Sequence, residues 1–169
     1  MTLLFCLVAN STVHQLKRGV GLSIDVPSMW RINYDLFGLP IVIVGPMKNG
    51  KRITIGITPT KRADIQASPQ EMKRDYPKYR QGRERWVKKH GGAVIQFHPF
   101  EEIKRLDGPT LYRAGYQYTL SNERYEELSY YINCPKELVH LKTLIALDTF
   151  SSEQEQVKKI VESFQCRGQ

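Results

Sequence analysis

The chain has 169 residues, of which 41% are hydrophobic and 25% are charged, a composition typical of one globular domain with a single core. It carries a net charge of +8, and no apolar run approaches the roughly 18 residues that span a bilayer. These values exclude a disordered chain and predict no transmembrane segment.

The first residues form a short apolar segment. Leu3 to Ala9 resembles the apolar region of a secretory signal, and Ala9-Asn10-Ser11 has the small residues of a cleavage site. A positively charged n-region is missing, and the alternative is a first β-strand packed on the sheet. We interpret residues 1–11 as a truncated signal and residues 12–169 as a single α+β domain, periplasmic or secreted. Retention of residues 1–11 would instead indicate a cytoplasmic protein.

The three cysteines favour the same compartment. Removal of Cys6 with the signal leaves Cys134 and Cys166, an even pair. Cys134 ends a predicted strand, and Cys166 follows the last predicted helix. We therefore predict a disulfide between Cys134 and Cys166 that staples the end of this helix to the sheet.

Three strands are predicted in the first third of the chain. Gly21 to Val26 alternates and is closed by Pro27, Leu39 to Val44 is apolar at consecutive positions, and Ile53 to Thr58 alternates again. Trp30 is expected to anchor the core. Asn49-Gly50 predicts a tight hairpin between the second and third strands.

The same hairpin fits part of a phosphate-binding loop. Gly45 to Lys51 matches the first seven positions of that motif. However, Arg52 stands where a Ser or Thr hydroxyl should hold magnesium, and a strand follows where the motif needs a helix. We interpret the segment as a turn, and we expect no nucleotide or other cofactor.

A long helix is predicted to begin at Ser68, which forms a capping box with Glu71 and precedes a proline at the first helical position. Pro77 predicts a kink or a restart near Tyr76, and Gly91-Gly92 ends the segment. One stripe of this helix carries apolar and aromatic side chains: Met72, Tyr76, Tyr79 and Trp86.

The helix also carries most of the excess charge. Its eight basic residues against three acidic ones leave +5 of the total +8. They form a candidate docking surface: Lys73, Arg74, Lys78, Arg80, Arg83, Arg85, Lys88 and Lys89. Its partner would be another protein or an anionic surface, and a secretory route argues against nucleic acid. The alternative is that these side chains are only the solvated face of a helix whose aromatic stripe is buried.

Four strands and a helix are predicted in the second half. Ala93 to His98 is a strand, and Phe100 to Asp107 is a polar connection to an alternating meander. The meander comprises Leu111 to Leu120, Leu128 to Cys134 and Leu138 to Leu147, with turns at Ser121 to Arg124 and Pro135 to Glu137. Ser151 and Ser152 are expected to cap a final helix with a buried stripe of Val157, Ile160, Val161 and Phe164. This order predicts an α+β fold in which helices cover an antiparallel β-sheet.

Three of these features together resemble a known family. They are Gly21 to Trp30, the buried strand that ends in Gly45-Pro46, and the order of helix, meander and closing helix. Over residues 20 to 166 the chain resembles the PsbP-like superfamily, a Mog/PsbP-type α/β/α sandwich. That superfamily includes photosystem extrinsic subunits, a small-GTPase-binding nuclear import factor and bacterial envelope proteins of unknown role. The resemblance implies a binding or assembly role and supplies no catalytic residues.

No arrangement of residues predicts a reaction. The four histidines, His14, His90, His98 and His140, lack metal-ligand spacing, so we expect no metal. Cys134 near His140 is interpreted as half of a disulfide rather than a nucleophile. Glu101-Glu102 and Glu126-Glu127 are adjacent pairs whose side chains diverge, and we interpret both pairs as contributors to solubility.

Two hypotheses for the function remain. The first is a secreted or periplasmic non-catalytic interaction module that uses the basic helical segment or the sheet face. The second is a small-ligand carrier or an enzyme, whose pocket would be built from residues distant in sequence.

Overall fold

A computed structural model describes residues 10–15, 21–36, 38–60, 65–135 and 137–167, and its main element is a seven-stranded antiparallel sheet. The strand order is β3-β4-β5-β9-β8-β7-β6. The strands are β3 (Arg31–Leu36), β4 (Leu39–Val44), β5 (Thr54–Pro59), β6 (Ala93–Ile103), β7 (Leu111–Leu120), β8 (Glu123–Asn133) and β9 (Leu138–Ala146).

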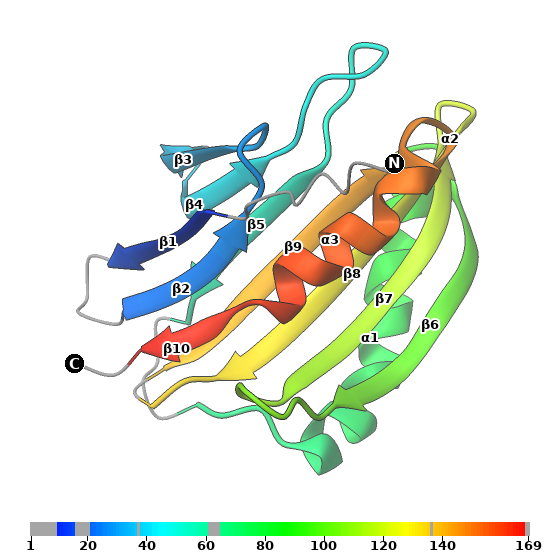
Figure 1. Ribbon diagram of the computed structural model, residues 1–169. Coiled ribbons are helices and arrows are strands. Elements are labelled where there is room, and N and C mark those ends of the chain that lie inside the picture. The colour runs from blue at the N-terminus through cyan, green and yellow to red at the C-terminus, as the bar shows by residue number, and fades with distance from the viewer. Residues whose placement is uncertain (1–9, 16–20, 37, 61–64, 136, 168–169) are drawn as a thin grey trace, which may run out of the picture.

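Other elements cover each face of this sheet (Figure 1). Helix α1 (Pro69–Lys89) packs on one face, against β6 and β7. On the opposite face lie helix α3 (Gln154–Glu162) and a three-stranded sheet of β1 (Asn10–Gln15), β2 (Gly21–Val26) and β10 (Gln165–Arg167). A short helix α2 (Leu147–Phe150) and the 3-10 turn η1 (Ser151–Glu153) connect β9 to α3. The prediction of an antiparallel sheet covered by helices is confirmed.

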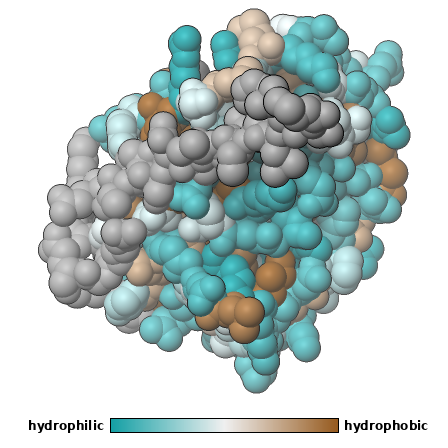
Figure 2. Space-filling view, in the orientation of Figure 1, coloured by the Kyte–Doolittle hydropathy of each residue, from teal (hydrophilic) through white to brown (hydrophobic). Residues whose placement is uncertain are grey.

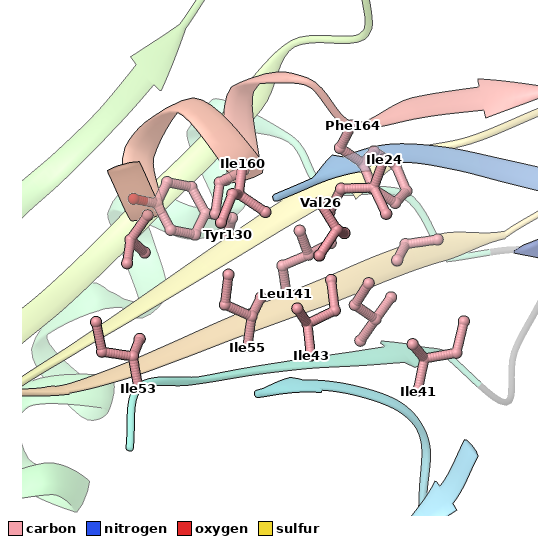
Figure 3. Close-up of a cluster of buried hydrophobic side chains, with 14 of the residues drawn as sticks. Ile24, Val26, Ile41, Ile43, Ile53, Ile55, Tyr130, Leu141, Ile160 and Phe164 are labelled. Carbon is pink, nitrogen blue, oxygen red and sulfur yellow. The ribbon is translucent and has the colours of Figure 1, made fainter. Parts of the chain in front are cut away.

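The main core lies between the large sheet, β2 and α3. Leu22, Ile24 and Val26 of β2 point toward Ile41, Ile43, Ile55 and Leu141 of the large sheet, and several of these side chains converge in Figure 3. The predicted stripe of α3, namely Val157, Ile160, Val161 and Phe164, closes the same core. Burial of this continuous apolar set is the main force that fixes β2 and α3 on the sheet.

A smaller core lies under α1. Val87 of the helix is buried with Tyr116 and Tyr118 of β7, and Tyr79 packs on its edge. Tyr116 and Tyr118 stack with ring centroids 5.1 Å apart, while Trp86 meets Tyr118 edge-on and keeps 40% of its surface exposed. The predicted stripe is therefore inward-facing, with Trp86 at its border.

Local sequence signals set several of these elements. The Ser68 hydroxyl oxygen accepts from the amide of Glu71 at 3.2 Å, and this N-cap begins α1. The helix then continues through Pro77 without the predicted restart. At the β4–β5 hairpin, Asn49 and Gly50 both have positive φ, and Lys48 and Lys51 exchange two 3.0 Å backbone hydrogen bonds.

Three boundaries differ from the prediction. β6 runs on to Ile103 instead of ending at His98, because two bulges, one of them beside Pro99, break the alternation that marks a strand. β8 begins at Glu123, since Ser121 and Asn122 alone form the turn with positive φ. Ser151 and Ser152 do not cap the last helix: α3 begins at Gln154 without a side-chain cap.

Three strands were not predicted: β1, β3 and β10. The first two residues of β1, Asn10 and Ser11, belong to the segment predicted as a signal. β3 is a sheet-edge strand with exposed polar side chains, so its alternation is weak, and Asp35 within it has positive φ. β10 has three residues, too few for a periodic pattern.

Cys134 and Cys166 form a disulfide bond with their Cα atoms 5.6 Å apart. Cys134 follows β8 of the large sheet, and Cys166 lies in β10, opposite Leu22 of β2. The bond therefore joins the two sheets covalently. Of the predicted signal, residues 1–9 lie outside the described part of the chain, and Asn10 and Ser11 begin β1, so its cleavage stays a prediction.

Candidate functional site

The outer face of α1 presents a broad basic surface. Seven of the eight predicted side chains are exposed: Lys73, Arg74, Lys78, Arg80, Arg85, Lys88 and Lys89. Arg74 pairs with Asp75, and Arg80 lies 4.8 Å from the ring centroid of Phe97. The other five make no ion pair with a described residue. Their charges are therefore available to a partner.

Arg83 differs from the other seven because it turns inward. Its guanidinium lies 3.5 Å from the carboxylate of Glu127 of β8, and the ammonium group of Lys142 of β9 lies 2.7 Å from the same carboxylate. Glu127 is only 4% exposed. This charge cluster of Arg83, Glu127 and Lys142 fastens the helix to the sheet. We therefore assign Arg83 to helix attachment and keep the other seven as the candidate docking surface.

Glu126, the neighbour of Glu127, is buried on the opposite face of the sheet. Its carboxylate contacts the Nε2 atom of His98 at 2.9 Å and accepts from Gln117 at 3.0 Å and from Gln154 of α3 at 3.3 Å. Burial raises the pKa of Glu126, but the hydrogen bonds from His98 and Gln117 outweigh it and hold the pKa below its usual value. Interpreting these two glutamates as solubility residues was wrong, although their side chains diverge as expected.

His140 lies on the α1 side of β9, beside the charge cluster. Its ring stacks on Tyr131 with centroids 4.7 Å apart. Burial, together with the charges of Lys142 and Arg83, lowers the pKa of His140 to about 4. The ring is consequently neutral at physiological pH, and its Nε2 atom has no hydrogen-bond partner among the described residues.

Two hollows lie on the α1 side of the large sheet. The first, of about 260 Å³, lies between the N-terminal half of α1 and the sheet and is lined by Met72, Tyr79 and Tyr131 among others. The second, of about 530 Å³, lies on the strands that α1 leaves open, and His140 and Lys142 belong to its lining. The stacked pair of Tyr131 and His140 therefore stands between the two hollows. Sequence reasoning missed both, because their residues come from strands far apart in the chain.

The opposite face offers a third, polar hollow of about 250 Å³ between α3 and β6 to β8, around Glu126. Beyond that hollow, the visible placed residues of this face are mostly hydrophilic, with small separate hydrophobic patches (Figure 2). Among the described residues, no three His, Cys, Asp or Glu side chains are grouped where they could hold a metal ion. Nor does any helix of the described chain have the length and apolarity needed to cross a membrane.

Comparison with solved structures identifies the fold. The solution structure of cyanobacterial PsbP (CyanoP) from Synechocystis sp. PCC 6803 matches with a TM-score of 0.62, over 99% of this chain and 98% of that one, at 12% identity. The chain has a PsbP-like fold. No protein-family model matches its sequence, and no curated protein sequence matches it either.

A second structural match is the crystal structure of LpqN, described as involved in cell envelope biogenesis of Mycobacterium tuberculosis. Its TM-score is 0.60, at 17% identity, and the match covers 94% of this chain and 91% of LpqN. At such identities the matches establish architecture, while function must be argued from this chain's own surfaces.

Proposed function

We propose that this PsbP-like protein is a non-catalytic binding module of an extracytoplasmic compartment, which docks through the outer face of α1 on an acidic surface of a partner protein. The observation that carries this proposal is the set of seven exposed basic side chains on one helix. Five of them make no ion pair within the described chain. Such a field attracts an acidic partner and speeds association.

The disulfide supports the extracytoplasmic part of the proposal. Disulfides persist in oxidising compartments and are rare in the cytosol. The fold supports it too, since the structural neighbour LpqN is a protein involved in cell envelope biogenesis.

The test uses immobilised poly-L-glutamate as an acidic polypeptide probe and measures binding of the oxidised full chain at low and physiological salt. The variant Lys78→Gln, Arg85→Gln, Lys88→Gln removes three exposed charges of α1. The matched control Lys104→Gln, Lys158→Gln, Lys159→Gln removes three exposed charges elsewhere. We expect the α1 variant to bind several-fold more weakly than the control, with a difference that shrinks as salt rises.

Equal weakening by both variants would mean that net charge alone drives binding, and it would overturn the proposed surface. Binding to phosphatidylglycerol vesicles but not to poly-L-glutamate would overturn the protein partner in favour of a lipid surface.

One observation favours a second function, that of a small-ligand carrier. The hollow of about 530 Å³ on the open strands has the size of typical ligand sites. Its lining comes from three parts of the chain, as a pocket built from residues distant in sequence requires.

A further inference from the structure

The larger hollow exists because α1 covers only part of its face of the sheet. The helix packs against β6 and β7. On the same face, β4, β5 and β9 carry no helix of the described chain, as Figure 1 shows. Side chains that point to this face from β4, β5 and β9 therefore have no packed layer over them among the residues that the structure describes.

Strand register orders the hollow from end to end. Val44, Thr54 and Leu144 are paired neighbours at one end, and Val42, Gly56 and Lys142 form the middle. Leu36, Leu39 and Thr58 line the other end. The Leu39 side chain reaches over Gly56, since a Cβ atom at Gly56 would lie only 3.2 Å from the Cδ1 atom of Leu39. The result is an elongated, mostly apolar trough.

Positive charge is confined to two places in this trough. Arg52 lines the end near Val44, and one of its guanidinium nitrogens donates to the carbonyl oxygen of Gly45 at 2.8 Å. Lys142 flanks the middle, where Glu127 neutralises it. No carboxylate of the described residues lines the trough. Arg52 therefore has no acidic partner there.

We propose that this trough binds a long-chain fatty acid, with its carboxylate on Arg52 and its acyl chain running over Gly56 toward Leu36 and Leu39. The inference rests on the carrier function and is independent of the α1 docking surface. An acyl chain suits the apolar walls, since its burial removes apolar surface from water on both sides. A single carboxylate suits the guanidinium, which binds planar anions through two parallel hydrogen bonds.

The alternatives fit the same geometry less well. An alkylammonium ion would place a cation beside Arg52, and a neutral ester would leave the guanidinium without its counter-ion. A ligand with several charges would have to desolvate them against Leu36, Leu39 and Leu144.

The experiment follows the fluorescence of cis-parinaric acid, which rises when this fatty acid enters an apolar site. Full-length oxidised protein is titrated, and the probe is displaced by palmitate, by methyl palmitate or by hexadecyltrimethylammonium, each below its micellar concentration. We expect palmitate to displace the probe best. The variant Arg52→Gln should lower the affinity for palmitate roughly tenfold, which is the loss expected for one charge-assisted contact. The affinity for methyl palmitate should not change.

Two further variants complete the test. Thr54→Phe fills the trough and should abolish binding of all ligands, and circular dichroism checks that it folds. Arg85→Gln on α1 should bind palmitate like the wild type. If Thr54→Phe does not fold, the inference is tested by Arg52→Gln alone, through its affinities for palmitate and for methyl palmitate.

Equal displacement by palmitate and its ester, or no effect of Arg52→Gln on palmitate, would overturn the fatty-acid inference while leaving a carrier of neutral ligands. Absence of displacement by any of the three would overturn the carrier function as well. Neither result bears on poly-L-glutamate binding, which is tested with different residues.

Discussion

Removal of the disulfide should destabilise the protein by about 4 kcal/mol. The variant Cys134→Ala, Cys166→Ala frees two residues separated by 32 positions. The loop-closure entropy of such a crosslink corresponds to about 3.7 kcal/mol at room temperature. Cys134 is buried, so the lost sulfur adds a small packing cost. For a chain of this length the melting temperature should fall by roughly 7 to 15 °C.

The structure also predicts which part of the protein opens first when the disulfide is removed. β10 pairs with β2 over three residues, while α3 is held by its own buried stripe. Without the bond, β10 should detach from β2 first. The backbone amides of β2 on the edge that faced β10 should then lose their protection from hydrogen exchange. Amide hydrogen exchange resolves this order, because local openings exchange before global unfolding.

Urea unfolding measures the global effect, with the fluorescence of buried Trp30 as the signal. All proteins carry Cys6→Ala to prevent thiol exchange. A reductant should lower the stability of the disulfide-containing protein to that of the variant and leave the variant unchanged. A loss below about 1 kcal/mol, or β10 amides that exchange no faster, would refute the reasoning from loop closure.

Two more predictions concern the charged residues beside α1. Because the pKa of His140 is about 4 in the fold and about 6.5 in the unfolded chain, the unfolded state binds more protons between these values. The free energy of unfolding should therefore fall by up to about 3 kcal/mol as the pH drops from 6.5 to 4. His140→Phe should flatten this part of the pH profile of stability. If the profile of this variant matches that of the wild type, His140 is not its source. Glu127→Gln should cost about 1 to 3 kcal/mol in urea unfolding, since Arg83 and Lys142 lose their shared carboxylate. Glu155→Gln, at an exposed position of α3, is the control, and an equal loss in both variants would contradict the charge cluster.

The elements predicted from the sequence are those whose signals are local. Ser68 and Glu71 mark the start of α1 because the cap is made within one turn of the chain. Asn49-Gly50 marks a hairpin because its backbone conformation depends on these two residues alone. Even the placement of α3 follows from a stripe within one segment, which can only be buried against the sheet.

The predictions were wrong where residues distant in sequence determine whether a side chain is buried or how far a strand extends. Glu126 and Glu127 look like surface residues, yet both are buried, because His98, Gln117 and Gln154 satisfy one and Arg83 and Lys142 the other. β6 continues past Pro99 because pairing with β7 resumes after a bulge, which local alternation does not reveal.

The sequence by itself therefore determined an antiparallel α+β scaffold with a basic helix, since periodicity, caps and turn residues act over a few neighbouring positions. Only the tertiary structure decided which faces of the sheet stay open. The trough lined by Arg52, Gly56 and Lys142 arises because α1 is displaced toward β6 and β7, and no short segment of the chain encodes that offset. The candidate ligand site depends on how the layers overlap, whereas the candidate docking surface depends on the sequence of one helix.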